Sequence, residues 1–203
     1  MDLEEAVRRR RMVRSFSERP VGPEVVDRLV AGSLRSPTAG HARGTAWLVL
    51  EGRQQTAAYW RATTTAGWRE GSRRGPGLSR APVVALALAS PGSYVARYAE
   101  EDKVGPGPDL GGDPGSWPVP YWFGDAAFCV MTLLLEATAS GLGACLLGTF
   151  RGERRLLDTL GVPGGWRLFG AVLLGHPDGA DHRSGSLDRP GPSRADRVHR
   201  GRW

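Results

Sequence analysis

The stretch that most constrains the fold of this chain is the apolar run between Asp125 and Ser140. Its length and composition predict a helix, with Asp125 as the N-cap and Gly141 as the stop signal. Apolar residues cover most of its circumference: Phe128, Cys129, Val130, Met131, Leu133, Leu134 and Leu135. A helix that is apolar on nearly all sides must be buried in a core or against a partner subunit. The rest of the chain is therefore expected to pack around it.

Patterns on both sides of this helix predict a mixture of helices and strands. Apolar and β-branched stretches predict strands, the third of which opens into a glycine-containing turn: 45–50, 81–88, 141–150 and 166–174. Helical spacing and end signals predict a short helix starting at Leu3 and further helices: 23–34, 54–66, 93–101 and 153–160. Residues 71–78 are expected to form a basic loop, and 105–120 a long loop that acts as a lid or a dimer contact. A chain of 203 residues with these elements suits one domain.

The excess of basic residues says little about binding partners. The chain has 27 Lys and Arg against 21 Asp and Glu, a net charge of +6, which would ordinarily suggest nucleic acid or a membrane surface. Lys103 is the only lysine, however, and isoleucine and asparagine are absent, so the residues with A/T-rich codons are depleted. Such a bias raises the arginine content for reasons unrelated to binding. The arginines are also spread among acidic residues.

No targeting or membrane signal is evident in the sequence. The start of the chain lacks a basic segment followed by an apolar one, and no uninterrupted apolar run reaches about 18 residues. Cys129 and Cys145 lie in apolar surroundings without metal-ligand spacing and are expected to be buried free thiols. These features predict a soluble cytoplasmic protein that does not bind a membrane.

An arginine cluster from Arg8 to Arg14 ends the first predicted helix and leads into an extended segment anchored by Phe16. Arginines at a helix C-terminus are favourable without any ligand, because they complement the helix dipole. The alternative is an anion cradle, since the guanidinium fork matches a phosphate. Residues 35–44, a loop of small residues, could approach a ligand closely or be a plain connection.

Several kinds of active site are disfavoured by the motifs. Gly143 to Gly148 has the glycine spacing of a P-loop but is followed by Thr149, where that loop needs lysine. The histidines lack metal-ligand spacing, so no metal site is predicted: His41, His176, His182 and His199. No nucleophile, paired carboxylates or other catalytic side chain stands out. The remaining features suit a protein in which a bound cofactor carries out the chemistry.

The order and content of the segments resemble the FMN-dependent nitroreductase family over essentially the whole chain. The family opens with Arg-Arg-Ser-Val-Arg-x-Phe, which Arg10 to Phe16 match with Met12 in place of serine. Its second motif, Pro-Ser-x-x-Asn-x-Gln, is matched loosely by Pro37 to Arg43, and its Gly-Leu-Gly turn by residues 141–143. The closing His-x-x-x-Trp is matched by residues 199–203.

The resemblance implies an α+β sandwich with a mainly antiparallel central sheet flanked by helices, forming an intertwined homodimer with FMN at the subunit interface. Residues 1–203 would form one FMN-binding domain, with 176–203 a C-terminal tail that wraps the partner subunit. By carry-over, the cofactor-binding residues are Arg10, Arg11, Met12, Arg14, Thr38, Leu146, Leu147, Gly148 and Arg189. The arginines of the first motif would bind the phosphate and the polar edge of the flavin, Thr38 would touch the flavin, and a backbone N–H near Gly148 would face its N5 atom. Arg194 is the alternative to Arg189 as the tail residue at the phosphate.

The implied activity is a two-step reduction in which NADH or NADPH passes hydride to the flavin and an electron-poor acceptor, such as a nitroaromatic or a quinone, then takes its place. Two alternatives stay open. One is a protein of the same fold that binds or sequesters FMN with little reductase activity, suggested by the unusual Met12 and His41. The other is a nucleic-acid-binding module, which the dispersed arginines disfavour.

Overall fold

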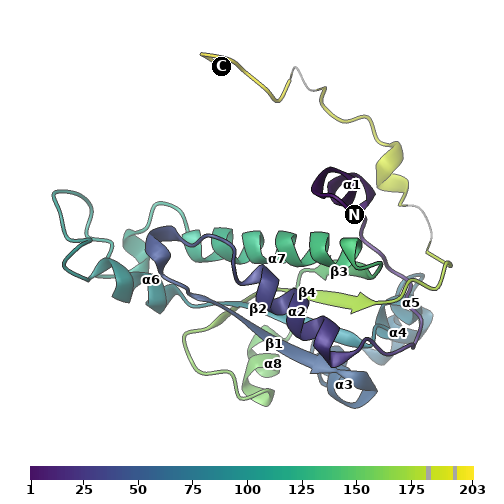
Figure 1. The fold of residues 1–203 in the computed structure, drawn as a ribbon. Helices are drawn as coiled ribbons and strands as arrows, with labels where there is room; N and C mark the ends of the chain where they lie inside the picture. Colours follow the sequence, from purple (N-terminus) through teal and green to yellow (C-terminus); the bar gives the residue numbers. More distant parts are fainter. Residues whose placement is uncertain (182–183, 194–195) are drawn as a thin grey trace.

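The structure of the chain, a computed structural model, describes residues 1–181, 184–193 and 196–203. Its centre is a four-stranded antiparallel sheet in the order β1-β2-β4-β3 (Figure 1). The strands are β1 (Thr45–Glu51), β2 (Val83–Ala89), β3 (Gly143–Leu147) and β4 (Arg167–Gly175). Each lies within two residues of where the sequence places it, except that β3 covers only the first part of its predicted span. The predicted α+β class with an antiparallel sheet is confirmed.

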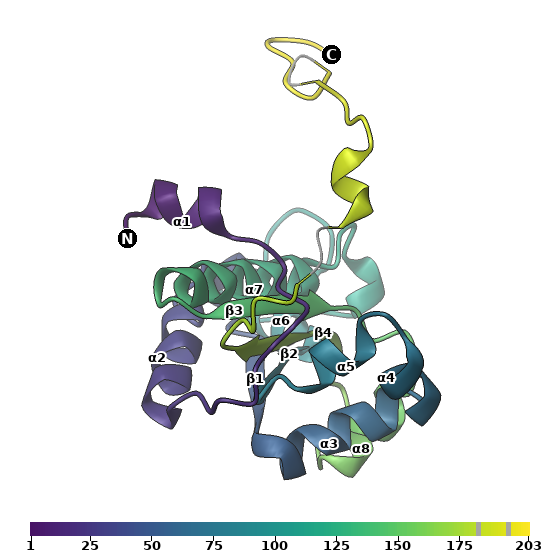
Figure 2. The same ribbon diagram turned by 90° about the vertical axis from the view of Figure 1, so that its right-hand side faces the viewer.

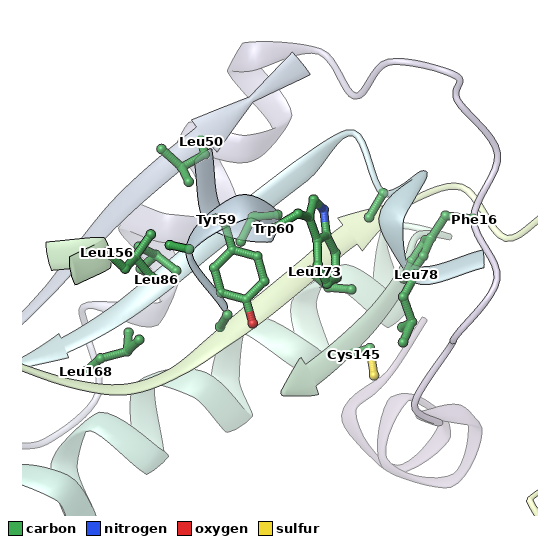
Figure 3. Close-up of a cluster of buried hydrophobic side chains, with 14 of the residues drawn as sticks. Phe16, Leu50, Tyr59, Trp60, Leu78, Leu86, Cys145, Leu156, Leu168 and Leu173 are labelled. Atoms are coloured by element: carbon green, nitrogen blue, oxygen red, sulfur yellow. The ribbon is translucent and has the colours of Figure 1, made fainter. Parts of the chain in front are cut away.

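Helices cover both faces of the sheet because its central strands are apolar on both sides. All residues of β2 are buried, and they alternate between two cores. Val84, Leu86 and Leu88 join the core beneath α3 (Gly52–Thr63) and α8 (Glu153–Thr159), part of which is drawn in Figure 3. Val83 and Ala87 join the core beneath α2 (Pro23–Ser33) and α7 (Tyr121–Ala139). Figure 2 shows the resulting sandwich, with α7 above the sheet and α3 and α8 below it.

The long helix starts earlier than the sequence suggests. It begins at Tyr121, so the prediction that Asp125 caps it is wrong. Asp125 lies inside the helix, 3% exposed, because its carboxylate accepts hydrogen bonds from other segments instead of from its own helix. By length and composition alone α7 could cross a membrane, but core helices meet the same criterion and its inner side packs on the sheet.

The region between β1 and β2 also differs from the prediction. Two short helices, α4 (Ala66–Gly71) and α5 (Gly75–Ser79), occupy the stretch in which 71–78 was expected to be a loop. Proline and glycine obscured α5, although proline is tolerated in a first helical turn. The helix α6 (Pro91–Tyr98) starts two residues early because Ser90 caps it, its side chain accepting from Ser93 N–H.

The long segment before α7 is tied to the body of the protein by Trp117. This side chain is 7% exposed, and its indole N–H donates to Leu110 O at 2.9 Å. It packs edge-on against Tyr94 and Trp122, so an aromatic core closes this end of the molecule. The predicted long loop contains one short 3-10 helix, η2 (Pro114–Ser116).

Candidate functional site

The arginine segment runs along the outer edge of the sheet. The helix α1 (Leu3–Arg9) is capped by Asp2, as expected, and the chain then becomes extended. Val13 N–H donates to Ala144 O on the edge strand β3 at 2.9 Å, and Met12 forms a bridge with the same residue. Phe16, fully buried, anchors the end of the segment in the core, which confirms the predicted apolar anchor.

A polar clamp holds this segment against the residues that follow β4. Ser15 Oγ donates to Asp178 Oδ2 at 2.8 Å, and Arg80 Nε donates to Phe16 O at 2.8 Å. Arg80 also forms an ion pair with Asp178 at 2.5 Å. Hydrogen bonds and the Arg80 charge hold the pKa of Asp178 below its usual value, against the effect of its burial. The clamp thus joins the N-terminal segment, α5 and the start of the tail.

The arginine segment has the properties of an anion cradle. The backbone N–H of Arg14 donates to the carboxylate of Asp181 at 3.1 Å, so a negatively charged group already occupies this position. Arg10 and Arg11 take part in no ion pair within the described part of the chain. Guanidinium groups without an ion-pair partner, beside an N–H that donates to an anion, fit the phosphate of FMN.

A further arginine, missed from the sequence, belongs to this positive region. Burial raises the pKa of the Cys145 thiol to about 11, while the positive charges of Arg14 and Arg74 act in the opposite direction. Both guanidinium groups therefore lie within electrostatic range of the same strand residue. Arg74 immediately precedes α5, whose Gly77 O accepts from Phe16 N–H at 3.2 Å. Its position in a basic loop was the available signal, but only the packing of α5 links it to Arg14.

The end of β3 offers an apolar platform beside the arginines. Leu146 and Leu147 are half-buried, and Gly148 is exposed. Leu146 N–H points out from the sheet edge, because it contacts Met12 Sδ at 3.4 Å. The platform therefore offers apolar contact surface of the kind that suits a flat aromatic ligand.

The segment from Thr38 to Gly44, here called the Thr38 loop, contains backbone that L-residues rarely adopt. Gly40, His41 and Arg43 have φ values of 59°, 61° and 52°. For a non-glycine residue this conformation costs about 1–2 kcal/mol, so surrounding contacts must hold it. At Gly40 a side chain would also meet the Tyr98 ring at 2.6 Å. Such strain concentrates at functional sites.

The Thr38 loop contacts α7 near its start, whereas the arginine segment contacts the strand that follows the end of α7. Ala39 N–H donates to Asp125, near the start of the helix, whereas Met12 pairs with Ala144, just past its end. Fourteen residues separate Asp125 from the last helical residue, Ala139, which corresponds to about 21 Å along the axis. The structure thus places Met12 and Arg14 beside β3, with Arg10 and Arg11 just before them in the same segment, but keeps Thr38 on another part of the molecule.

Comparison with known proteins identifies the family of this chain. The family model described as "Nitroreductase family" matches residues 7–176 of the chain. The chain belongs to the nitroreductase family. The predicted resemblance is confirmed, and the chain is accordingly an oxidoreductase of the nitroreductase type.

Relatives of this nitroreductase share its length and fold. A protein of Archaeoglobus fulgidus, provisionally named NADH dehydrogenase/NAD(P)H nitroreductase, is 24% identical over 96% of this chain and 94% of its own. The nitroreductase CinD of Lactococcus lactis, solved in complex with nicotinic acid, superposes with a TM-score of 0.76 at 15% identity, covering 99% of this chain and all of its own. A nitroreductase of Desulfovibrio desulfuricans, solved with FMN, gives a TM-score of 0.70 at 18% identity, covering 100% of this chain and 98% of its own.

The tail of this nitroreductase leaves one prediction without support. Arg189 is exposed at the end of η3 (Gly185–Asp188), in the part that projects away from the sheet (Figure 1). Within the described chain no hydrogen bond or ion pair joins its side chain to the arginine segment. The alternative, Arg194, lies outside the described residues.

Gly77 provides a test of the contact between α5 and the arginine segment. A Cβ at Gly77 would meet Arg14 O at 2.6 Å, so Gly77→Ala is expected to lower the free energy of unfolding by about 1–3 kcal/mol. The control is Gly67→Ala in α4, where the added methyl meets nothing within 4 Å. Alanine there is expected to stabilise the helix by about 0.5–1 kcal/mol. Urea denaturation measures both, and equal effects would contradict the close contact.

Proposed function

We propose that this chain is an FMN-dependent oxidoreductase that takes hydride from NADH or NADPH and reduces an electron-poor small molecule, such as a nitroaromatic or a quinone. The observation that carries the proposal is the backbone N–H of Arg14, which donates to a carboxylate beside two arginines that form no ion pair among the described residues, at the edge of an apolar platform. The FMN bound to the Desulfovibrio relative and the nicotinic acid bound to CinD support a flavin and a nicotinamide donor, respectively.

FMN, when bound, would accept the hydride and pass the electrons on. The chain's own residues would bind and orient it. Arg10, Arg11 and Arg14 would neutralise the phosphate and the negative charge of the reduced ring. Leu146 and Leu147 would exclude water from one face of the ring. The N–H of Gly148 is expected to point out of the sheet like that of Leu146, because alternate residues of extended backbone face the same way. Water would supply the proton, since no acidic or basic side chain is assigned to that role.

We further propose that the enzyme is a homodimer in which the Thr38 loop of one subunit completes the site of the other. The separation of the Thr38 loop from the arginine segment supports this arrangement. So does apolar surface left uncovered on two neighbouring helices: Leu3 (69% exposed) and Val7 (50%) on α1, and Phe128 (53%) and Met131 (40%) on α7. Exposed apolar patches of this kind are typical of subunit interfaces. The tail from residue 176 would wrap the partner, with Arg189 reaching its phosphate.

The test is the visible absorption spectrum of the purified protein, followed without oxygen as NADH or NADPH is added. A flavin spectrum that bleaches is the expected result. A flavin spectrum that persists with both donors would favour the alternative of an FMN-sequestering protein. A colourless protein that cannot be reconstituted with FMN would contradict the proposal.

A further inference from the structure

Asp125 is an acidic residue in a place where charge is costly. It lies in α7 with 3% of its surface exposed. One of its oxygens, Oδ2, accepts two hydrogen bonds from other parts of the chain, from Ala39 N–H at 2.8 Å and from the Tyr94 hydroxyl at 2.7 Å. A buried carboxylate destabilises a protein unless such partners compensate for the lost hydration. Packing of α7 alone therefore does not explain why Asp125 is present on this helix.

The reason lies in the Thr38 loop, whose left-handed residues need support from outside the loop. Two side chains hold successive residues of its backbone. Asp125 accepts from Ala39 N–H, and Arg97 Nε donates to Gly40 O at 2.8 Å. Arg97 is itself held by a bidentate ion pair with Asp102. The loop is therefore held by hydrogen bonds from α7 and from α6.

These hydrogen bonds lie next to Thr38, the residue expected to touch the flavin. Thr38 directly precedes Ala39, and its Oγ1 accepts from Arg43 N–H at 3.1 Å. Because that bond uses the hydroxyl oxygen as an acceptor, the hydroxyl proton is left to donate to a ligand. A shift of Ala39 would displace this hydroxyl and the closing hydrogen bond of the loop together.

We propose that Asp125 is a positioning residue that sets the affinity for FMN by holding the Thr38 loop through Ala39 N–H. This inference rests on the proposed function, since it takes FMN as the ligand of the loop. A carboxylate suits the task because it only accepts hydrogen bonds and forms stronger ones than a neutral group. Asparagine would bring two N–H groups that need acceptors in a buried place.

Two groups that face Asp125, the Tyr94 phenol and the Cys129 thiol, stay neutral. Burial raises the pKa of Tyr94, and its hydrogen bond to Asp125 raises it further, so the phenol stays a donor. Burial likewise raises the pKa of Cys129, one turn further along α7, so the thiol stays neutral. The carboxylate of Asp125 therefore faces no competing anion on these two sides.

The experiment compares Asp125→Asn, Ala39→Pro and Tyr94→Phe. Ala39→Pro removes the N–H that donates to Asp125, and the position is one at which proline is commonly found. Ala39 is the first residue of the 3-10 helix η1 (Ala39–His41), and Thr38 before it is extended, with φ −131° and ψ 142°. Tyr94→Phe is the matched control, because it removes the other hydrogen bond to the same oxygen. The measurements are the FMN dissociation constant, from flavin fluorescence titration of the apoprotein, and the apoprotein melting temperature.

Asp125→Asn and Ala39→Pro are expected to raise the FMN dissociation constant about tenfold or more. Tyr94→Phe is expected to lower the melting temperature but leave that constant unchanged. Ala39→Pro keeps the test valid if Asp125→Asn fails to fold. If all three variants had lower melting temperatures but bound FMN like the wild type, Asp125 would have only a structural role. That result would overturn this inference and leave the proposed function standing. A wild type that takes up no FMN would overturn the proposed function and this inference with it.

Discussion

Replacement of Phe16 by alanine is expected to lower the free energy of unfolding by about 3–5 kcal/mol, the usual cost of emptying a buried aromatic site. Phe16 is fully buried, and its ring lies beside Leu78 in the core beneath the sheet (Figure 3). Its backbone is held on both sides, through Gly77 O and the Arg80 guanidinium. The segment therefore cannot simply collapse into the cavity that the ring leaves. For this reason the expected loss of stability is as large as about 3–5 kcal/mol.

Urea denaturation of the apoprotein measures this effect without interference from a ligand. The matched control is Phe150→Ala, because that ring is 95% exposed and its removal should change stability by less than about 0.5 kcal/mol. A loss at Phe16 as small as that at Phe150 would mean that the arginine segment does not depend on its apolar anchor.

Replacement of Arg14 by alanine is expected to weaken FMN binding by about 1.5–3 kcal/mol, or roughly 10- to 150-fold. This is the scale of a charge-assisted hydrogen bond. The guanidinium already lies over the segment, since its Nη1 donates to Met12 O at 3.1 Å, so little freedom is lost when a ligand binds. Loss of the side chain leaves the backbone N–H in place, and residual binding through that group is expected.

Flavin fluorescence titration measures the effect of Arg14→Ala, with Arg154→Ala as the control of equal charge change. Arg154 lies on α8, and its side chain is 91% exposed in an ion pair with Asp158. Arg154→Ala should leave FMN affinity unchanged. Equal affinities in the wild type and both variants would exclude the arginine segment as the phosphate cradle.

The core of the fold was predictable because its signals are local. Strands β1, β2 and β4 follow from apolar and β-branched runs, and α7 from a helix-length segment that is apolar on nearly all sides. The arginine segment was predictable in the same way, since a charged run followed by one large apolar residue, Phe16, needs no distant partner to be recognised. The resemblance of four motifs, in the right order, to those of the nitroreductase family further predicted FMN as the ligand.

The helix boundaries and the polar contacts were decided only in three dimensions. The sequence shows Asp125 as a good cap, but its carboxylate instead receives Ala39 N–H and the Tyr94 hydroxyl, which lie 86 and 31 residues away along the chain. Arg74 is one arginine among many until folding brings it, like Arg14, within electrostatic range of Cys145. Local periodicity decides which residues form helices and strands. The partner of a buried polar group depends on which distant segments packing brings to it, and that information is present only in the folded chain.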